Sequence, residues 1–267
     1  MKKTALLLIS IALIASCNSD DNAGNVITDD TTGPTLVSVD FNFTQNFDGE
    51  NIVNADFDEL KFTNENGQTM SISKLVYLIS DISFENSSGE IFTAGDYNLV
   101  DVRNASNLTF TPDVTIPEGT YTVSFTYGFN DEDNVNGAYE DLNVADGTWS
   151  VPEPLGGGYH YMRLEGKYIN SINEEIGYQF HNVRANDMST TPLTLKDTSI
   201  EVILGSITIV DGATIEVKMD VAEWFKNPNL WDLNTEFQML MPNYDAQLRM
   251  NENGQNVFSL GEVTPAI

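Results

Sequence analysis

The chain has 267 residues, of which 41% are hydrophobic and 10% aromatic, and this composition supports a sizeable folded core and excludes a disordered chain. Its 40 acidic and 12 basic residues give a net charge of -28 at pH 7. A surface this acidic repels nucleic-acid phosphates and anionic lipid head groups, so we exclude DNA and RNA as partners and expect no electrostatic attachment to a membrane.

The first segment has the features of a secretory signal peptide. Lys2 and Lys3 form a short basic start, residues 4–15 are apolar apart from Ser10, and small residues lead up to Cys17. This order of regions is typical of an export signal, and the apolar run is too short for a membrane-spanning helix. We therefore expect residues 1–16 to be removed on export.

Cys17 is the only cysteine and stands where the small residues end. The segment resembles a bacterial lipobox, which implies that Cys17 becomes the lipidated first residue of the mature protein and anchors it in the membrane. Asp20 and Asp21 follow and resemble an export signal for the outer cell surface. We therefore expect an outer membrane lipoprotein exposed at the cell surface. The alternative is a plain signal peptide with an incidental cysteine.

Residues 17–35 are predicted to form a flexible tether. They combine Asp, Asn, Gly and Thr with no aromatic residue, and such a segment cannot bury enough apolar surface to order itself. From Leu36 the pattern changes, because apolar and polar residues alternate from Val37 to Thr44 as in a half-buried strand. Residues 36–267 are therefore predicted to be one folded domain.

Further strands are predicted over residues 59–62, 71–84, 97–102 and 120–127. Residues 159–169 and 176–183 are predicted to pair as a hairpin. A second hairpin is predicted for residues 199–210 and 214–221, with its turn at Asp211 and Gly212.

One segment departs from the strand pattern. Residues 221–226 are predicted to form a short helix that ends at Asn227 and Pro228, with Trp224 and Trp231 capping the core there. Short strands separated by turn clusters predict an all-β fold, which we assign as an antiparallel β-sandwich with one short helix near the C-terminal third.

The sequence contains no motif for nucleophilic catalysis or phosphate binding. It has two histidines and no Gly-x-Ser-x-Gly, and the glycines at 156–158 lack the lysine and the following helix of a phosphate loop. We therefore predict a binding protein and not an enzyme.

An oxygen-rich loop at residues 129–137 is a candidate calcium site, because calcium prefers six to eight oxygen ligands. Asn143 occupies the position where an EF-hand needs a bidentate glutamate, so the loop is not an EF-hand. It is either a different kind of calcium site or a solvated turn.

His160 and His181 are the candidate transition-metal ligands, because imidazole suits copper and zinc. Met162 is a weak auxiliary candidate, since a thioether favours Cu(I). The alternative is that both histidines are structural.

Several stretches resemble the MbnP-like family: residues 74–82, residues 157–166, Phe180 with His181, and residues 241–244 together with 252–258. The matching pieces run from about Phe41 to Phe258 and so cover nearly the whole predicted domain. The resemblance implies a β-sandwich and a secreted, copper-binding, non-enzymatic protein.

The resemblance also implies roles for single residues. His181 matches the family's Phe-His block, and His160 is a plausible second copper ligand. Trp149 is the best candidate for a tryptophan that a dihaem peroxidase-like partner enzyme oxidises to kynurenine, which then helps to hold copper. Gln45 stands where relatives carry histidine, and glutamine is a poorer copper ligand.

The alternation of side chains sets a condition on this site. In residues 159–168, His160 shares the inward parity of Met162, whereas His181 falls on the polar side of its own strand. Regular strands keep this alternation, so a joint site predicts an irregularity between Tyr178 and His181.

Taken together, the sequence predicts a lipid-anchored copper-binding protein that acts in copper acquisition or storage outside the cytoplasm. We expect metal loss below about pH 5–6, because imidazole must be neutral to bind. The alternative is a cell-surface binding or adhesion module that needs no metal or is stabilised by calcium.

Overall fold

The computed structural model describes residues 33–265. The predicted signal peptide, the lipidation site Cys17 and all but the end of the predicted tether lie outside the described residues. Within the described part no helix is long and apolar enough to cross a membrane. Residues 34–265 belong to one compact unit.

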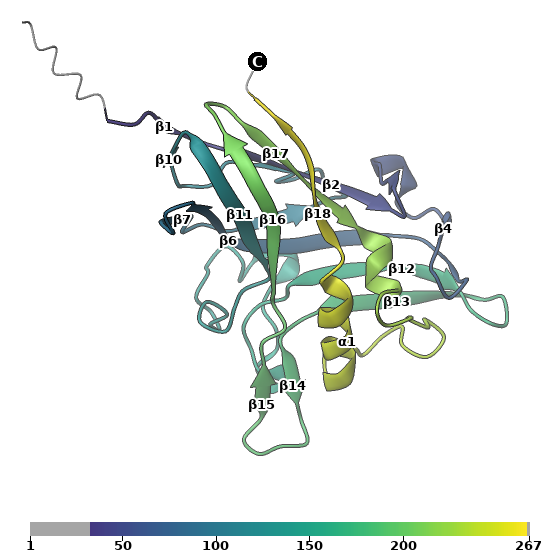
Figure 1. Cartoon of the computed structure of the whole chain (residues 1–267). Coiled ribbons are helices and arrows are strands. Elements are labelled where there is room, and N and C mark those ends of the chain that lie inside the picture. Colours follow the sequence, from purple (N-terminus) through teal and green to yellow (C-terminus); the bar gives the residue numbers. More distant parts are fainter. Residues whose placement is uncertain (1–32, 266–267) are drawn as a thin grey trace, which may run out of the picture. The chain divides into compact units, whose positions relative to one another are not determined.

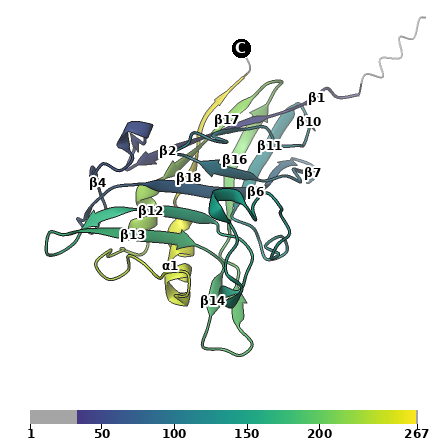
Figure 2. The same ribbon diagram turned by 180° about the vertical axis from the view of Figure 1, so that it is seen from behind.

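Two sheets form the body of this unit (Figures 1 and 2). The larger sheet has nine strands in the path β16-β11-β6-β12-β5-β4, with β13 on β12 and with β7 and β8 on β6. Its members are β4 (Phe62–Thr63), β5 (Thr69–Met70), β6 (Lys74–Asn86), β7 (Ile91–Thr93), β8 (Asn98–Asp101), β11 (Gly119–Tyr127), β12 (Met162–Ile169), β13 (Glu175–Asn182) and β16 (Ile200–Ile209).

The smaller sheet has five strands in the path β18-β17-β2-β3, with β9 on β2. Its members are β2 (Asp40–Phe47), β3 (Glu50–Asn51), β9 (Thr109–Phe110), β17 (Thr214–Asp220) and β18 (Phe258–Thr264). Two small pairs complete the strands: β1 (Leu36–Val37) with β10 (Ile116–Pro117), and β14 (Ala185–Asp187) with β15 (Thr194–Lys196).

Among residues 33–265 the helices are one α-helix and four short 3-10 turns: α1 (Tyr244–Gly254), η1 (Asn54–Asp56), η2 (Ala145–Gly147), η3 (Glu153–Leu155) and η4 (Val221–Phe225). The helix predicted at residues 221–226 is η4, a 3-10 turn whose Trp224 is fully buried, as is Trp231. The helix α1 was not expected from the sequence. Asn243 caps it by accepting a hydrogen bond from the backbone N–H of Ala246.

The core lies between the two sheets and confirms the predicted sandwich. Alternate residues of β2, such as Phe41 and Phe43, are buried together with residues of the larger sheet, and the rings of Phe43 and Tyr77 lie 6.4 Å apart edge to face. Each such side chain contributes about 1.5–3 kcal/mol of stabilisation when fully buried.

The predicted hairpin of residues 199–210 and 214–221 is wrong. The turn at Gly212 carries the chain from one sheet to the other, because β16 pairs with β11 whereas β17 pairs with β18 and, in parallel, with β2. Turn residues specify a reversal of the chain but not which strands pair. Here both strands bury their alternate residues in the same core from opposite sides. The hairpin predicted for residues 159–183 is confirmed as β12 and β13.

Candidate functional site

The larger sheet is buried on both faces in the region of β6 and β12. One face contributes Tyr77 and Met162, which are paired across the strands, to the main core. The other face carries Val76 and Leu78 and is covered by a second hydrophobic cluster that includes Trp149. Since directly paired residues share a face, Arg163 and His181, which pair with each other, lie on the Val76 side.

The backbone that leads into β12, on the face of the sheet that carries Val76, is not regular strand. Gly156, Gly157 and Gly158 have φ values of +100°, +64° and +78°, and regular strand begins only at Met162. A Cβ on Gly158 would lie 2.2 Å from Oδ1 of Asn134. Only glycine therefore allows the backbone to pass this close at such angles.

The irregularity explains how the two histidines come together. Asn134 is buried, and its Oδ1 accepts a hydrogen bond from the backbone N–H of Tyr159 at 2.7 Å. The predicted irregularity between Tyr178 and His181 is wrong, because the register of β12 and β13 is continuous there. The irregular backbone lies instead just before β12. Because His160 precedes the regular strand, its side chain does not have to lie on the same face of the sheet as Met162.

His160 is almost fully buried, with 3% of its surface exposed. Its Nδ1 lies 2.8 Å from the carbonyl oxygen of Trp149. A carbonyl oxygen only accepts hydrogen bonds, so Nδ1 carries the proton and Nε2 keeps its lone pair. Burial lowers the pKa of His160 to about 3, and the nearby guanidinium of Arg163 adds to this effect.

His181 is held in the complementary way. Its Nε2 lies 2.9 Å from Oε1 of Glu165, the next outward-facing residue along β12 from Arg163. The hydrogen bond from His181 lowers the pKa of Glu165, so the carboxylate is ionised and accepts the proton on Nε2. The nitrogen that keeps its lone pair in His181 is therefore Nδ1.

The ring centroids of His160 and His181 lie 5.6 Å apart, with the ring planes at 79°. Two imidazoles that bind one ion from opposite sides have centroids about 6 Å apart, because each metal–nitrogen bond is about 2 Å long. The second nitrogen of a metal-binding histidine usually donates to a carbonyl or a carboxylate, as the bonded nitrogens of both residues do here. The centroid distance and the bonded nitrogens of the pair are therefore compatible with two imidazole ligands of one ion.

The charged groups around the pair balance one another. Arg163 Nη1 lies 2.9 Å and Lys74 Nζ lies 2.8 Å from Oδ2 of Asp146. Burial tends to raise the pKa of Asp146, but hydrogen bonds from Lys74 and Arg163 outweigh it and hold the pKa below its usual value. With Glu165, two cations and two anions surround the imidazoles.

Trp149 lies beside both His160 and Arg163. Its ring is fully buried, 5.6 Å from the ring of His160, and the guanidinium carbon of Arg163 stands 4.8 Å from its centroid. The preceding Thr148 has a φ of +124°, a strained conformation that presents its carbonyl to Arg163 as a hydrogen-bond acceptor. The indole Nε1 is buried without a hydrogen-bond partner, which is rare for a buried donor.

Two of the predicted site residues lie elsewhere. Met162 is fully buried in the main core, on the other face of the sheet. Gln45 is buried in β2 and donates hydrogen bonds to the hydroxyl of Tyr77 and the carbonyl of Phe43. The structure therefore brings His160, His181 and Trp149 together but not Met162 or Gln45.

The loop predicted as a calcium site is used for positioning. Asn134 holds Tyr159, and Asn130 accepts hydrogen bonds from the backbone of Glu132 and Asp133 within the loop. Within residues 33–265, no three His, Cys, Asp or Glu side chains gather closely enough to hold a metal ion. Any ion at the two imidazoles therefore takes its further donors from another kind of group.

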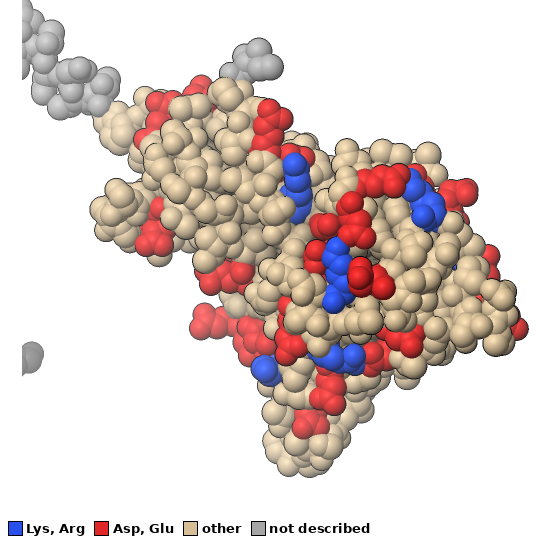
Figure 3. Space-filling view, turned by 45° about the vertical axis from the view of Figure 1, so that its right-hand side comes forward, with Lys and Arg blue, Asp and Glu red and all other residues tan. Residues whose placement is uncertain are grey.

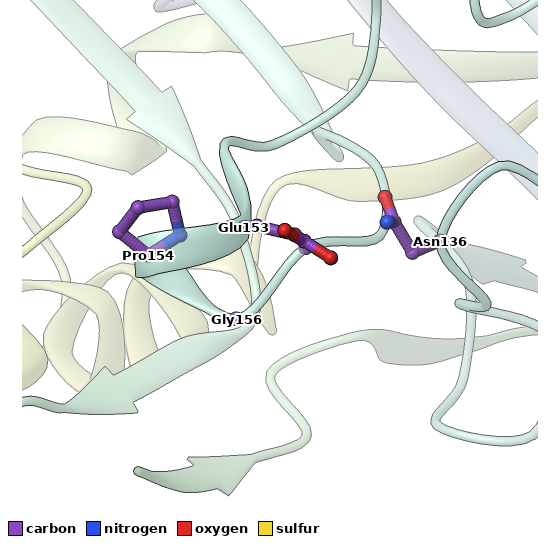
Figure 4. Close-up of a pocket in the computed structure, with 5 residues that line it drawn as sticks. Asn136, Glu153, Pro154 and Gly156 are labelled. Carbon is purple, nitrogen blue, oxygen red and sulfur yellow. The ribbon is translucent and has the colours of Figure 1, made fainter.

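A hollow of about 520 Å³ opens beside the glycine run. Figure 4 shows the side chain of Glu153 extending toward Asn136 across it, with Pro154 and Gly156 on the opposite side. One carboxylate and one amide are too few ligands for a hard cation. On the face of the molecule shown in Figure 3, acidic side chains are spread widely among few basic ones, with no basic stripe that would attract nucleic acid.

Comparison with known proteins adds two findings. The family model described as MbnP matches residues 37–242, which is most of the chain. Among solved structures, MbnP from Methylosinus trichosporium is similar with a TM-score of 0.52 and 13% sequence identity, over 85% of this chain and 99% of that one. None of the curated proteins matches the sequence.

Proposed function

Because the chain belongs to the MbnP family, we propose that it is a copper-binding protein that acts outside the cytoplasm, with His160 and His181 as its imidazole ligands. The match to the family model supports the resemblance found in the sequence. The role we propose is to bind and carry copper, in acquisition or storage, without catalysing a reaction.

The observation that carries this proposal is the matched support of the two rings. His160 donates from Nδ1 to a backbone carbonyl and His181 donates from Nε2 to Glu165, so each ring keeps one unprotonated nitrogen. Copper accepts imidazole nitrogen as a preferred ligand. The rings are close enough, at 5.6 Å, to serve one ion.

The surroundings suit a weakly hydrated ion. His160 stays neutral far below the pH range of an ordinary histidine, so protons do not compete for its lone pair at neutral pH. Burial of Trp149 and His160 excludes water, and the balanced charges of Arg163, Lys74, Asp146 and Glu165 add no net repulsion. When bound, the copper ion would accept one nitrogen lone pair from each of the two rings.

We propose Trp149 as the source of a third donor. With hydrogen peroxide as the oxidant, a dihaem peroxidase-like partner would cleave the C2–C3 bond of the indole and place an oxygen on each carbon, with two peroxides reduced to water. Hydrolysis would then release C2 as formate and leave kynurenine, which has a ketone and an aromatic amine. The unpaired buried Nε1 and the 5.6 Å distance to His160 support Trp149 as the modified residue. Mass spectrometry of Trp149-containing peptides from the native host tests this point, and an unmodified indole in copper-loaded protein would contradict it.

Copper titration of metal-free protein tests the ligand assignment. His160→Ala and His181→Ala are each expected to weaken Cu(I) binding by about 10-fold to 100-fold or more, since each removes one imidazole ligand. Glu175→Ala, an exposed change on the same strand as His181, is the matched control and is expected to bind as the unchanged protein does. Equal affinity of His160→Ala and the unchanged protein would refute the two-imidazole centre.

We also propose that residues 1–16 direct export and that Cys17 carries the lipid anchor at the outer membrane. The basic, apolar and small-residue order before Cys17 supports this. Incorporation of labelled fatty acid, followed by membrane fractionation, is expected for the natural chain and not for Cys17→Ser. Membrane retention of the Cys17→Ser protein would contradict the anchor.

A further inference from the structure

The methionines of the described chain fall into two groups. Met70, Met162, Met219 and Met250 are fully buried in the core. The remaining three, Met188, Met239 and Met241, all line one pocket of about 330 Å³ beside His181. Met188 is 54% exposed and Met239 is 74% exposed, so their thioethers do not serve the core.

The pocket is assembled from two separate loops. Met188 follows β14 directly, whereas Met239 and Met241 come from the segment between η4 and α1. Met239 has a φ of +57°, a left-handed conformation that costs an ordinary residue about 1–2 kcal/mol. Met239 thus combines a left-handed backbone with an exposed thioether at the mouth of the pocket.

Hydrogen bonds tie the segment of Met239 and Met241 to β14 and, through α1, to the strand that carries His181. Nε2 of Gln247, on α1, donates to the carbonyl of Leu240 at 3.0 Å and to the carbonyl of His181 at 2.9 Å. Nδ2 of Asn186, on β14, donates to the carbonyl of Met241 at 2.8 Å. Leu240 itself is buried, so the methionines on either side of it are held in place at the pocket.

The chemistry of the lining selects one class of ligand. Thioether sulfur and imidazole are soft or intermediate donors that suit Cu(I), whereas Ca²⁺ and Mg²⁺ need oxygen ligands. No carboxylate lines this pocket, although the chain has 40 acidic residues. Leu155, Leu240 and Pro242 are the apolar residues of the remaining wall, and the neutral amide of Gln179 completes the lining.

We propose that Met188, Met239 and Met241 form a thioether site for a soft monovalent metal ion, adjoining His181, through which Cu(I) reaches the two-imidazole centre. The second half of this inference rests on the proposed function. The thioether site itself stands on the pocket alone. His181 is the shared residue, since it lines the pocket and lies beside His160.

Silver titration of protein labelled with methyl-¹³C methionine tests the site. Ag(I) is a redox-inert substitute for Cu(I), and the full mature chain with Cys17→Ser has no thiol to compete. The methyl resonances of Met188, Met239 and Met241 are expected to shift with Ag(I), and those of the four core methionines to stay unchanged. Single Met→Leu variants assign the signals, and the unchanged core signals report that each variant is folded.

The variant with Met188→Leu, Met239→Leu and Met241→Leu is expected to bind Ag(I) at least 10-fold more weakly. Met219→Leu, the same change in the core, is the control and is expected to leave the affinity unchanged. Three unmoved methyl signals, or equal Ag(I) affinity of the triple variant, would overturn the thioether site.

Cu(II) separates this inference from the proposed function, because thioethers bind Cu(II) poorly. The triple variant is expected to keep Cu(II) binding at the histidines, and His160→Ala is expected to lose it while keeping the methionine shifts. If the unchanged protein shows the methionine shifts with Ag(I) but binds no Cu(II) at the histidines, the proposed function is refuted and the thioether site stands. Slower loading of the histidines with Cu(I) in the triple variant is expected, and an unchanged loading rate would overturn the transfer route.

Discussion

Replacing the buried His160 should change how the stability of the metal-free protein depends on pH. In the folded protein burial lowers the pKa of His160 to about 3, whereas the unfolded chain has the ordinary histidine pKa of about 6.5. Between these values the unfolded state binds a proton that the folded state does not. The stabilisation is therefore complete above about pH 6.5 and is lost progressively as the pH falls toward 3.

The size of the effect follows from the two pKa values. Each pH unit below about 6.5 costs about 1.4 kcal/mol, so His160 alone removes about 2.7 kcal/mol between pH 7.5 and 4.5. His160→Gln has no titrating group at this position, so neither its folded nor its unfolded state gains a proton there. As the pH falls over that range, the free energy of unfolding of the natural protein should therefore decrease by about 2.7 kcal/mol relative to that of the variant, because all other groups titrate in both.

Denaturant unfolding of chelator-treated protein at several pH values between 7.5 and 4.5 measures this difference. His160→Asn is a second variant without a titrating group. The free energy of unfolding of the natural protein should decrease by the same amount relative to this variant, because its shorter side chain changes the stability equally at every pH. If the difference stays constant within about 0.5 kcal/mol for both variants, His160 titrates normally and is not the buried, neutral ring described here.

Three further outcomes are expected. Glu165→Ala should weaken copper binding about 10-fold to 100-fold in competition titrations, because the ring of His181 loses the hydrogen bond that orients it. Glu175→Ala, an exposed change on the neighbouring strand, should leave copper binding unchanged. Trp149→Phe should lower the free energy of unfolding by about 1–3 kcal/mol through lost packing and lost contact with a guanidinium, and full stability would contradict this. Gly158→Ala should cost about 3 kcal/mol or more in denaturant unfolding and Gly137→Ala only about 1 kcal/mol, since a Cβ would clash only at the first, and equal losses would refute the close approach.

The candidate site was predicted in part from residue chemistry and family resemblance. These indicated His160, His181 and Trp149, and the structure places the ring of His160 5.6 Å from each of the other two rings. Parity within regular strands, by contrast, placed the break in the wrong strand. No periodic pattern marks the backbone near residue 158, where three successive glycines have positive φ and the last of them meets the side chain of Asn134.

The supporting residues were not visible in the sequence. Glu165 lies 16 positions from His181 along the chain, and Asp146 lies 72 positions from Lys74, so only the pairing of strands and the folding of the covering loop bring them together. The methionine pocket is a similar case, because hydrogen bonds between distant segments hold its lining: Gln247 donates to the carbonyls of Leu240 and His181, and Asn186 donates to that of Met241.

The sequence by itself determined the class of fold and most of the strands, because alternation of apolar and polar residues is a local property that one strand carries alone. The hairpin of residues 159–183 and the buried tryptophans follow from such local patterns. Only the tertiary structure decided that β16 and β17 join different sheets, that α1 closes over β14, and that two imidazoles share one face of β12 and β13. The physical reason is that strand pairing, and the position of a side chain on an irregular backbone, depend on hydrogen bonds between residues far apart in the chain.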